Sequence, residues 1–390
     1  MTPGARVAAA ISILDQVLDG TAAEAALTGW ARGSRFAGSK DRAAVRDLVF
    51  DALRARRSLA ARGGAMTGRG LMIGLALRDD LGLDALFDGA GHAPAPLNDA
   101  ERAQSGDATP LPDPVAHDMP DWLWPLWCDS LGDDASAAAL AQQARAPVFL
   151  RINRRRGDSR TVIAALADDD VTAVPHPTVP GCLEVTGNAR RIGQSRAYTD
   201  GLVELQDASS QLAIQAVPVE SGARVLDYCA GGGGKALGFA DQHDAAVFAH
   251  DIAPERMRDL PARAARAGVT ITQLRTDALA RQAPFDVVFC DAPCSGSGTW
   301  RRTPDAKWRL AADDLDRLCA TQAEVIRAAA PLVAPGGVLA YATCSVLRSE
   351  NDGIVDDFLV ANPGWRRDRT ERLYPGAAGD GFFLSVLRDV

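Results

Sequence analysis

The sequence predicts an α/β protein whose C-terminal part forms a mostly parallel β-sheet covered by helices on both faces. From residue 223 onward, apolar runs of strand length alternate with helical patterns. These runs are apolar along nearly their whole length, which is typical of strands buried on both faces. Four glycines follow the first run, at the place where an open α/β sheet turns into a helix beside its ligand.

The strands of this part are predicted from five apolar runs and one further run near the C-terminus. They are ARVLDY (223–228), AAVFAHD (245–251), TITQLRTD (270–277), FDVVFCD (285–291), GVLAYAT (337–343) and GFFLSVLRD (381–389). The segments 254–268 and 311–333 have the residue pattern of intervening helices. This alternation predicts parallel strands joined by helical connections.

The N-terminal region is predicted to be helical up to about residue 90. Val7, Ile11, Leu14 and Leu18 fall on one face of a first helix. Ser39 is a candidate N-cap of another helix, whose apolar stripe is Val45, Leu48, Val49, Ala52 and Leu53. The segment 71–83 is a candidate third helix.

The middle of the chain predicts a linker and then a small α+β unit. Residues 91–120 are rich in Pro, Ala and Asp and lack periodicity, which is typical of a linker. Between 145 and 205, short apolar runs surround one helical pattern. For a chain of 390 residues we therefore expect three domains, 1–118, 119–215 and 216–390.

Cysteine usage and hydropathy indicate the compartment. The seven cysteines form no C-x-x-C pair, so we expect no metal site. No uncharged apolar run reaches about 18 residues, and Asp15 interrupts the N-terminal apolar segment, which we interpret as a helix rather than a signal peptide. We expect a cytoplasmic protein with reduced thiols, no membrane contact and no obligate protein partner, hence a monomer.

The charge distribution leaves the role of several basic clusters open. The net charge of −8 argues weakly against nucleic acid as a partner, yet Lys and Arg cluster within 151–156, 190–191 and 301–309. These clusters are either solvated faces or nucleic-acid contacts. Trp122, Trp124 and Trp127 could stack bases, but anchoring a helix to a neighbouring domain is the favoured interpretation.

The glycine-rich turn CAGGGGK is the first candidate binding element. Its residues are Cys229, Ala230, Gly231, Gly232, Gly233, Gly234 and Lys235. Glycines let the backbone approach a ligand and present its N–H groups. Because Ala236 follows the lysine, the turn is not a triphosphate-binding loop, and it fits the dinucleotide fingerprint poorly.

Three acids end successive predicted strands, namely Asp251, Asp277 and Asp291. Each alone is equally explained as a helix cap, but together they favour a nucleoside-shaped ligand. Asp251 is placed to accept hydrogen bonds from ribose hydroxyls, and Asp277 to meet an adenine edge. S-adenosylmethionine fits these features because it carries an adenosine and an amino-acid tail but no phosphate.

Two Cys-Ser pairs follow the ends of predicted strands, at Cys294 and Cys344. In order and spacing, CAGGGGK, DAPCSGSGTWRR and ATCSVLRSEN resemble the Sun/RsmB-type family of RNA (cytosine-5)-methyltransferases. The likeness covers most of the chain. The segment 201–217 resembles the stretch just before the family's catalytic domain, and 380–383 resembles its C-terminal strand. PVFLRIN (147–153) is similar to the start of its small RNA-binding subdomain. The N-terminal helices are similar to its NusB-like RNA-binding domain.

The resemblance implies a Rossmann-like class I methyltransferase domain with a mostly parallel seven-stranded sheet. By this likeness Cys344 is the nucleophile, Cys294 assists product release, and Asp291 holds the cytosine edge. Cys229–Lys235, Asp251, Asp277 and Asp291 would line the S-adenosylmethionine site. The implied substrate is a cytosine in RNA, 16S ribosomal RNA by family likeness, and the base must be unpaired or flipped out.

The glycine turn departs from the family pattern at two positions. The family usually reads CAAPGGK, so Gly231 and Gly232 replace Ala and Pro and the turn loses the stiffness of proline. The backbone donors of the turn survive this change. We therefore expect cofactor binding to persist.

Three competing functions fit the sequence less well. A DNA cytosine-5 methyltransferase would use the Cys294 thiol for attack and leave Cys344 unexplained. The intact thiols at both positions disfavour a non-catalytic RNA-binding or assembly factor. The poor glycine fingerprint disfavours a dinucleotide-dependent dehydrogenase.

Overall fold

The structure is a computed structural model that describes residues 1–104 and 110–390. It divides into two compact units. The first unit comprises Met1–Arg145 and Trp300–Ala311, and the second comprises Ala146–Thr299 and Ala312–Val390. The chain therefore leaves the second unit after Thr299, adds a short segment to the first unit, and returns. The domain boundaries that the sequence suggests, after residues 118 and 215, stay predictions.

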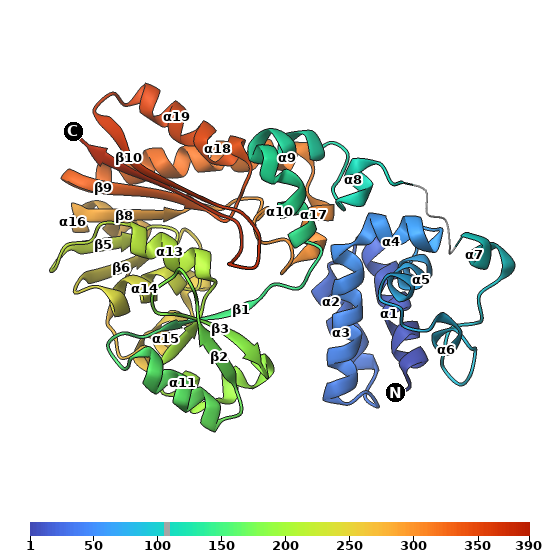
Figure 1. Cartoon of the computed structure of the whole chain (residues 1–390). Coiled ribbons are helices and arrows are strands. Elements are labelled where there is room, and N and C mark those ends of the chain that lie inside the picture. The colour runs from blue at the N-terminus through green and yellow to red at the C-terminus, as the bar shows by residue number, and fades with distance from the viewer. Residues whose placement is uncertain (105–109) are drawn as a thin grey trace. The chain divides into compact units, whose positions relative to one another are not determined.

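The first unit is helical in its described residues, and Figure 1 shows its long helices in blue. Its helices are α1 (Pro3–Leu18), α2 (Ala23–Gly33), α3 (Ser39–Arg54), α4 (Arg56–Gly63), α5 (Gly68–Arg78), α6 (Leu83–Leu86), α7 (Asp99–Gln104), α8 (Asp113–Ala116), α9 (Trp124–Leu131), η1 (Gly132–Asp134), α10 (Ala135–Ala141) and α17 (Pro304–Arg309). Val7 and Leu14 of α1 and Val45 and Val49 of α3 lie in one buried apolar cluster. The predicted apolar faces of these two helices therefore form the core of this unit.

Two details of the N-terminal prediction need correction. Ser39 is the first residue of α3 and not its N-cap; the cap position is Gly38, and no side chain bonds to the free N–H groups there. A capping side chain belongs to the residue that flanks the helix, and Ser39 lies one position later. The predicted linker, residues 91–120, contains two short helices, α7 and α8. Residues 105–109 of that linker lie outside the described residues.

The segment Trp300–Ala311 is fastened into the first unit by buried contacts. Trp300 is 1% exposed and stacks on Trp127, with ring centroids 6.1 Å apart. The backbone N–H of Arg301 donates to Gln142 Oε1 at 2.8 Å. Lys307 is 1% exposed. Trp127 of the tryptophan motif thus anchors α9 to another segment of the same unit and not to a neighbouring domain, and the basic cluster at 301–309 is partly buried rather than wholly solvated.

The second unit begins with a small antiparallel sheet in the order β2-β3-β1-β4. Its elements are β1 (Val148–Ile152), α11 (Ser159–Asp168), β2 (Thr172–Pro175), β3 (Cys182–Gly187), η2 (Ala189–Gln194), α12 (Arg196–Thr199) and β4 (Val203–Leu205). Leu150, Ile152, Val162 and Leu166 form part of a core of its own. The small α+β unit predicted between 145 and 205 is confirmed.

The large sheet has the strand order β10-β11-β9-β8-β5-β6-β7. Its strands are β5 (Arg224–Asp227), β6 (Ala246–His250), β7 (Ile271–Leu274), β8 (Phe285–Asp291), β9 (Val333–Thr343), β10 (Trp365–Leu373) and β11 (Phe382–Asp389). Strands β5 to β9 pair in parallel, and β11 runs antiparallel to both β9 and β10. The predicted α/β class with a mostly parallel sheet is confirmed.

Helices cover both faces of this sheet, as Figure 1 shows. They are α13 (Ala208–Ala216), α14 (Gly234–Gln242), η3 (Pro254–Met257), α15 (Leu260–Ala267), η4 (Thr276–Ala278), α16 (Leu279–Gln282), α18 (Ala312–Ala329), η5 (Ala330–Leu332), η6 (Arg348–Glu350) and α19 (Asp352–Ala361). Neighbouring residues of β8 enter different cores: Val287 joins a cluster with Leu237 of α14, and Val288 joins one with Ile326 of α18. This alternation follows from the period of two in a strand.

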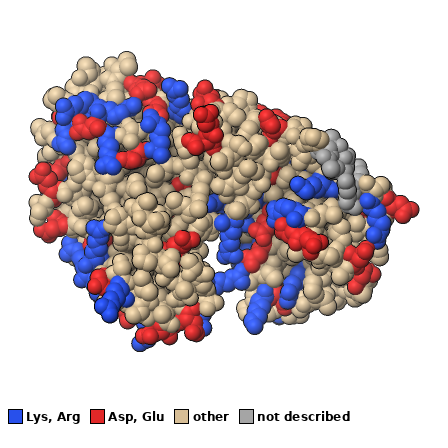
Figure 2. Space-filling view, viewed as in Figure 1, with Lys and Arg blue, Asp and Glu red and all other residues tan. Residues whose placement is uncertain are grey.

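Strand β10 is one element for which the sequence has no apolar signal. It reads WRRDRTERL, and as an edge strand it pairs only with β11. Its arginines find acidic partners: Arg369 Nε lies 2.5 Å from Glu371 Oε1, and Arg366 Nε lies 3.0 Å from Asp368 Oδ1. On the face seen in Figure 2, basic and acidic side chains likewise lie close together. Charged edge strands resist pairing with other chains.

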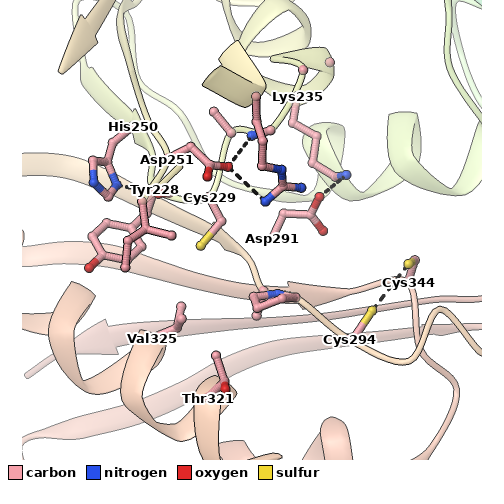
Figure 3. A pocket seen from close by; sticks show the side chains of 18 of the residues that line it. Tyr228, Cys229, Lys235, His250, Asp251, Asp291, Cys294, Thr321, Val325 and Cys344 are labelled. Carbon is pink, nitrogen blue, oxygen red and sulfur yellow. Dashed lines mark hydrogen bonds and ion pairs between the residues drawn. The ribbon is translucent and has the colours of Figure 1, made fainter. Parts of the chain in front are cut away.

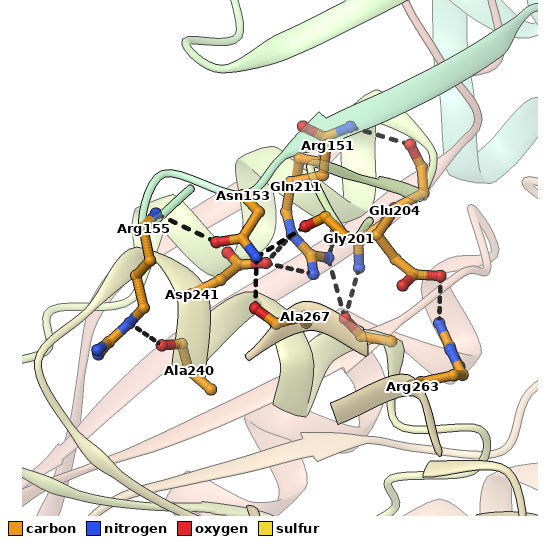
Figure 4. A network of polar contacts seen from close by, with 12 residues as sticks. Arg151, Asn153, Arg155, Gly201, Glu204, Gln211, Ala240, Asp241, Arg263 and Ala267 are labelled. Atoms are coloured by element: carbon orange, nitrogen blue, oxygen red, sulfur yellow. Dashed lines mark hydrogen bonds and ion pairs between the residues drawn. The ribbon is translucent and has the colours of Figure 1, made fainter. Parts of the chain in front are cut away.

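Arginines of the basic cluster at 151–156 stabilise the fold. Arg151 of β1 is 1% exposed, and its guanidinium lies 2.8 Å from Asp241 Oδ2 of α14. Figure 4 shows Arg151 beside Asp241. Arg151 also donates to Gln206 Oε1 at 2.5 Å and to the backbone oxygen of Gly234 at 3.1 Å. Arg155 donates to a backbone oxygen at the end of α14. Arg151 and Arg155 thus join the small sheet to the helix that follows the glycine turn.

Among the helices in residues 1–104 and 110–390, none combines the length and the apolar character needed to cross a membrane.

We predict that Trp300→Ala destabilises the first unit by about 3–5 kcal/mol, because truncating a buried aromatic leaves a cavity and removes its contacts. Denaturant unfolding of the whole chain, followed by circular dichroism, measures the effect. Arg309→Ala is the control: this side chain is 55% exposed, so its loss should cost about 0.5 kcal/mol or less. Equal unfolding free energies in the two variants would contradict the anchoring role of Trp300.

Candidate active site

The carboxyl ends of β5, β6, β8 and β9 open into one cavity of about 770 Å³. That volume lies in the range of small-molecule pockets. The side chains and backbone that line it are Gln206, Ser210, Tyr228–Gly232, Gly234, Lys235, His250–Ile252, Arg256, Thr276, Asp291–Cys294, Thr321, Glu324, Val325, Ala328 and Cys344. All of them belong to the second unit. The site therefore lies where open α/β sheets bind ligands.

The glycine turn forms one wall of the cavity. Gly231 and Gly233 have φ angles of +52° and +78°, a region that side chains disfavour, so glycine suits both positions. A Cβ at Gly233 would overlap the side chain of Leu260. Gly233 does not itself line the cavity, whereas the other residues of Cys229–Lys235 do. Replacing Ala and Pro by Gly231 and Gly232 therefore keeps the backbone cradle.

Asp251 and Asp277, the two acids predicted to meet the nucleoside, differ in position. Asp251 is 2% exposed and accepts from the backbone N–H groups of Gly231 at 2.8 Å and Ala253 at 3.0 Å. Arg256 Nη1 lies 3.2 Å from the same carboxylate. Asp277 lies in η4, its side chain is 73% exposed, and it does not line the cavity. Its neighbour Thr276 does line it, so the structure brings Asp251 to the pocket and leaves Asp277 outside.

A buried charge cluster lies beside the turn. Lys235 Nζ donates to Asp291 Oδ2 at 2.5 Å. Burial alone would lower the pKa of Lys235, but the attraction of Asp291 outweighs it and raises that pKa. Asp227, at the end of β5, accepts from the backbone N–H of Ala236 at 2.9 Å. Burial, and then repulsion by Asp291, raise the pKa of Asp227 to about 7.

The two predicted thiols meet at the end of the cavity. Cys294 Sγ lies 3.4 Å from Cys344 Sγ, and Figure 3 shows the two sulfurs facing each other near Asp291 and Lys235. The hydrogen bond from Cys294 lowers the pKa of Cys344, and Lys235 acts in the same direction, while burial and Asp291 oppose them. The same contact with Cys344, together with burial, raises the pKa of Cys294. Ionisation is therefore easier at Cys344 than at Cys294.

The cavity fits S-adenosylmethionine. Positive φ at Gly231 leaves an open backbone cradle that no Cβ fills. Asp251 uses three of its roughly four acceptor positions within the protein, which leaves one for a ligand hydroxyl. His250 and Thr276 bond to each other at 3.0 Å and line the cavity. The donor set thus suits an uncharged nucleoside with hydroxyls better than a triphosphate.

One buried group that sequence reasoning missed lies next to both thiols. Glu350 is 0% exposed and bonds to Ser295 and Ser345, which directly follow the two cysteines. The motif ATCSVLRSEN already contains this glutamate, but its spacing alone gives it no role. Only the fold shows that it touches both turns.

Comparison with known proteins identifies the family. Residues 214–388 match the family described as 16S rRNA methyltransferase RsmB/F, and residues 119–190 match its ferredoxin-like domain. A ribosomal RNA small subunit methyltransferase B from Xanthomonas campestris is 32% identical over 289 residues. The chain belongs to the RsmB/F methyltransferase family. The alignment covers 68% of this RsmB/F family member and 66% of the relative's length.

Solved structures support the fold of this family member. The crystal structure of PH0851 matches with a TM-score of 0.74 and 22% identity over 99% of both chains. A methyltransferase homolog protein from Pyrococcus horikoshii matches with a TM-score of 0.62 and 22% identity, over 71% of this chain and 97% of that one. Together with the family, the cavity identifies S-adenosylmethionine as the cofactor. Neither family match covers residues 1–118, so the NusB-like character of the N-terminal helices stays a prediction.

We predict that Asp227→Asn removes a pH dependence of stability. Because the folded pKa of Asp227, about 7, exceeds its unfolded value, this group stabilises the fold below about pH 4 and the stabilisation is lost as pH rises through 7. Between pH 4 and 8, the free energy of unfolding of the variant should therefore fall by on the order of 3 kcal/mol less than that of the wild type. Unfolding free energies across this range measure it. Asp259→Asn, whose side chain is 79% exposed, should keep the wild-type slope, and an unchanged slope in Asp227→Asn would contradict the assignment.

Proposed function

We propose that the protein methylates C5 of a cytosine in RNA, with 16S ribosomal RNA as the substrate. The observation that carries this proposal is the contact of two sulfurs, 3.4 Å apart, at one end of a cavity whose other wall is the glycine turn. The family and the relatives named as ribosomal RNA methyltransferases support the substrate class. The cytosine specificity rests on the chemistry of the thiols.

C5 of cytosine is a weak nucleophile and needs activation. Addition of the Cys344 thiolate to C6 forms an S–C6 bond and makes C5 nucleophilic. The lowered pKa of Cys344 supports this role, because only the thiolate adds. Bound S-adenosylmethionine supplies the electrophilic methyl group. The C5 proton then passes to solvent water as the S–C6 bond breaks, and Cys344 departs as a thiolate, the form in which it attacked.

The neighbouring groups would handle protons and orientation. Cys294, held as a thiol with a raised pKa, is placed to assist release of the product from the sulfur it already contacts. Asp291 would hold the cytosine edge and stabilise a proton at N3. Lys235, bonded to Asp291 at 2.5 Å, fixes the orientation of that carboxylate and places a positive charge beside Cys344.

The substrate base must lie outside a helix, because the attacking sulfur needs access to C6. We propose that the first unit helps to select the RNA, as the likeness of its helices to a NusB-like domain implies. The cytoplasmic location and the monomeric state remain predictions.

The pKa directions also distinguish this proposal from attack by Cys294, the arrangement expected of a DNA cytosine-5 methyltransferase. A nucleophile with a raised pKa would be mostly protonated near neutral pH. The pKa of Cys294 is raised by its contact with Cys344, by burial and by Glu350, whereas the pKa of Cys344 is lowered, with Lys235 contributing to the lowering. These directions therefore favour Cys344 as the attacking group.

We predict that Cys344→Ala lowers methylation by at least about 10³-fold and abolishes covalent capture of RNA that carries 5-fluorocytidine, because the attacking sulfur is gone. Denaturing electrophoresis detects the capture. Bisulfite sequencing of RNA from cells with the wild type or the variant measures the methylation. Capture that persists in Cys344→Ala would refute the nucleophile assignment. Cys128→Ala, in the first unit, should behave as the wild type.

We predict that Cys294→Ala accumulates a protein–RNA adduct and turns over at least about 10²-fold more slowly, because addition, although slower without the Cys294 hydrogen bond, still proceeds while release lacks its assisting group. The adduct is measured with unmodified RNA on denaturing gels. It should be absent from the Cys294→Ala, Cys344→Ala double variant. Normal turnover by the single variant would exclude the release role.

A further inference from the structure

Glu350 is a buried carboxylate on which four hydrogen-bond donors converge. It ends η6 and is 0% exposed. Its Oε1 accepts from the backbone N–H of Ser295 at 2.7 Å and from Gln322 Nε2 at 3.0 Å. Its Oε2 accepts from Ser295 Oγ at 2.5 Å and from Ser345 Oγ. Because an ionised carboxylate offers about four acceptor sites, this one is fully bonded.

The serines that donate to this carboxylate stand next to the two cysteines in the sequence. Ser295 directly follows Cys294, and Ser345 directly follows Cys344. One side chain therefore joins the two turns that carry the sulfurs. The turns belong to different strands, β8 and β9, so no local backbone hydrogen bond within either turn can set the distance between them.

Further bonds join the same two turns. Ser297 Oγ lies 2.8 Å from Ser345 Oγ and accepts from the backbone N–H of Val346 at 2.9 Å. The backbone N–H of Gly298 donates to the oxygen of Cys344 at 2.9 Å. Glu350 supplies the charged centre of this network. Bonds to an ionised group are stronger than neutral ones, and burial strengthens them further.

Core packing alone does not explain a carboxylate here. Burying an acid is costly unless its oxygens are bonded, and an apolar side chain of similar volume would fill the space without that cost. Glu350 does not line the cavity, so it lies outside the space that is open to a ligand there. Its effect on chemistry must pass through the turns that it holds.

We propose that Glu350 is a positioning residue that keeps Cys294 in hydrogen-bond contact with Cys344. Through that contact it maintains the reactive thiolate of Cys344 and the alignment of the thiol that assists release. The inference rests on the proposed function for the roles of the two cysteines. It adds Glu350, whose replacement should change the reactivity of the Cys344 thiol even without RNA.

The test compares Glu350→Ala with Glu350→Gln in the full chain. Glutamine can turn its oxygen to the two N–H donors and its NH₂ to the two serine hydroxyls, which can accept, so it should retain most of the geometry. In Glu350→Ala we expect alkylation of Cys344 by iodoacetamide at pH 7 to slow about tenfold, as its pH profile moves up by about one unit. We expect kcat to fall about 10²-fold, with KM for RNA within about threefold, because misplaced groups affect the chemical step.

Controls separate positioning from general loss of structure. Glu371→Ala, on β10, should leave the alkylation profile and kcat unchanged, and circular dichroism should show that the variants are folded. If Glu350→Ala does not fold, Ser345→Ala is tested in its place, because it removes one of the four hydrogen bonds to Glu350. We expect it to shift the pH profile of Cys344 alkylation upward by less than Glu350→Ala would. A folded Glu350→Ala with the wild-type profile and kcat would overturn the inference.

The two readouts also keep this inference apart from the proposed function. Mass spectrometry of the alkylated Cys344 peptide needs no RNA and no methyl transfer. A wild type that methylates no cytosine, while alkylation of Cys344 still depends on Glu350, would overturn the proposed function and leave the positioning role standing. Loss of methylation in Glu350→Ala without any change in the alkylation profile would overturn the positioning role.

Discussion

The parallel pairing of β8 with β9 is the constraint on which the site depends. Their register places Asp291 opposite Ala342, so both strands end at the same edge of the sheet. The chain turns within a few residues of each end, and the backbone N–H of Ala292 still donates to the oxygen of Ala342 at 2.9 Å. Two residues that lie fifty positions apart thereby reach a sulfur–sulfur distance of 3.4 Å. A shift of register would separate them.

The same edge concentrates negative charge, and this governs how its groups titrate. Asp227 ends β5, Asp291 ends the neighbouring β8, and Asp251 directly follows β6 on the other side of β5. Lys235 lies beside Asp291. The lysine pairs with Asp291, Asp251 bonds to backbone N–H groups and Arg256, and Asp227 responds by a raised pKa. Each acid thus reduces its electrostatic cost in a different way, as burial of several like charges requires.

Several basic residues have structural roles, whereas others of the predicted clusters, such as Arg191 and Arg309, are exposed. Arg151 joins the small sheet to α14, Arg301 lies buried in the first unit, and arginines of β10 pair with neighbouring acids. These roles are consistent with a net charge of −8 in a protein that we propose acts on RNA. The segment Trp300–Ala311 connects the turn of Cys294 with the first unit through the chain itself, because Trp300 is buried there directly after Thr299.

Local patterns in the chain predicted the parallel strands, the helices between them, the glycine turn and the motifs of the two thiols, because apolar periodicity and turn residues act over a few neighbours. Such local patterns cannot predict which distant segments of the chain pair with each other. An arginine-rich strand such as β10 forms only because β11 offers it an edge, and Arg151 is buried only because Asp241 lies opposite. Likewise, Asp277 lies in η4 after β7 and stays exposed, and Glu350 gains three donors from two turns and a fourth from α18, which folding alone brings together.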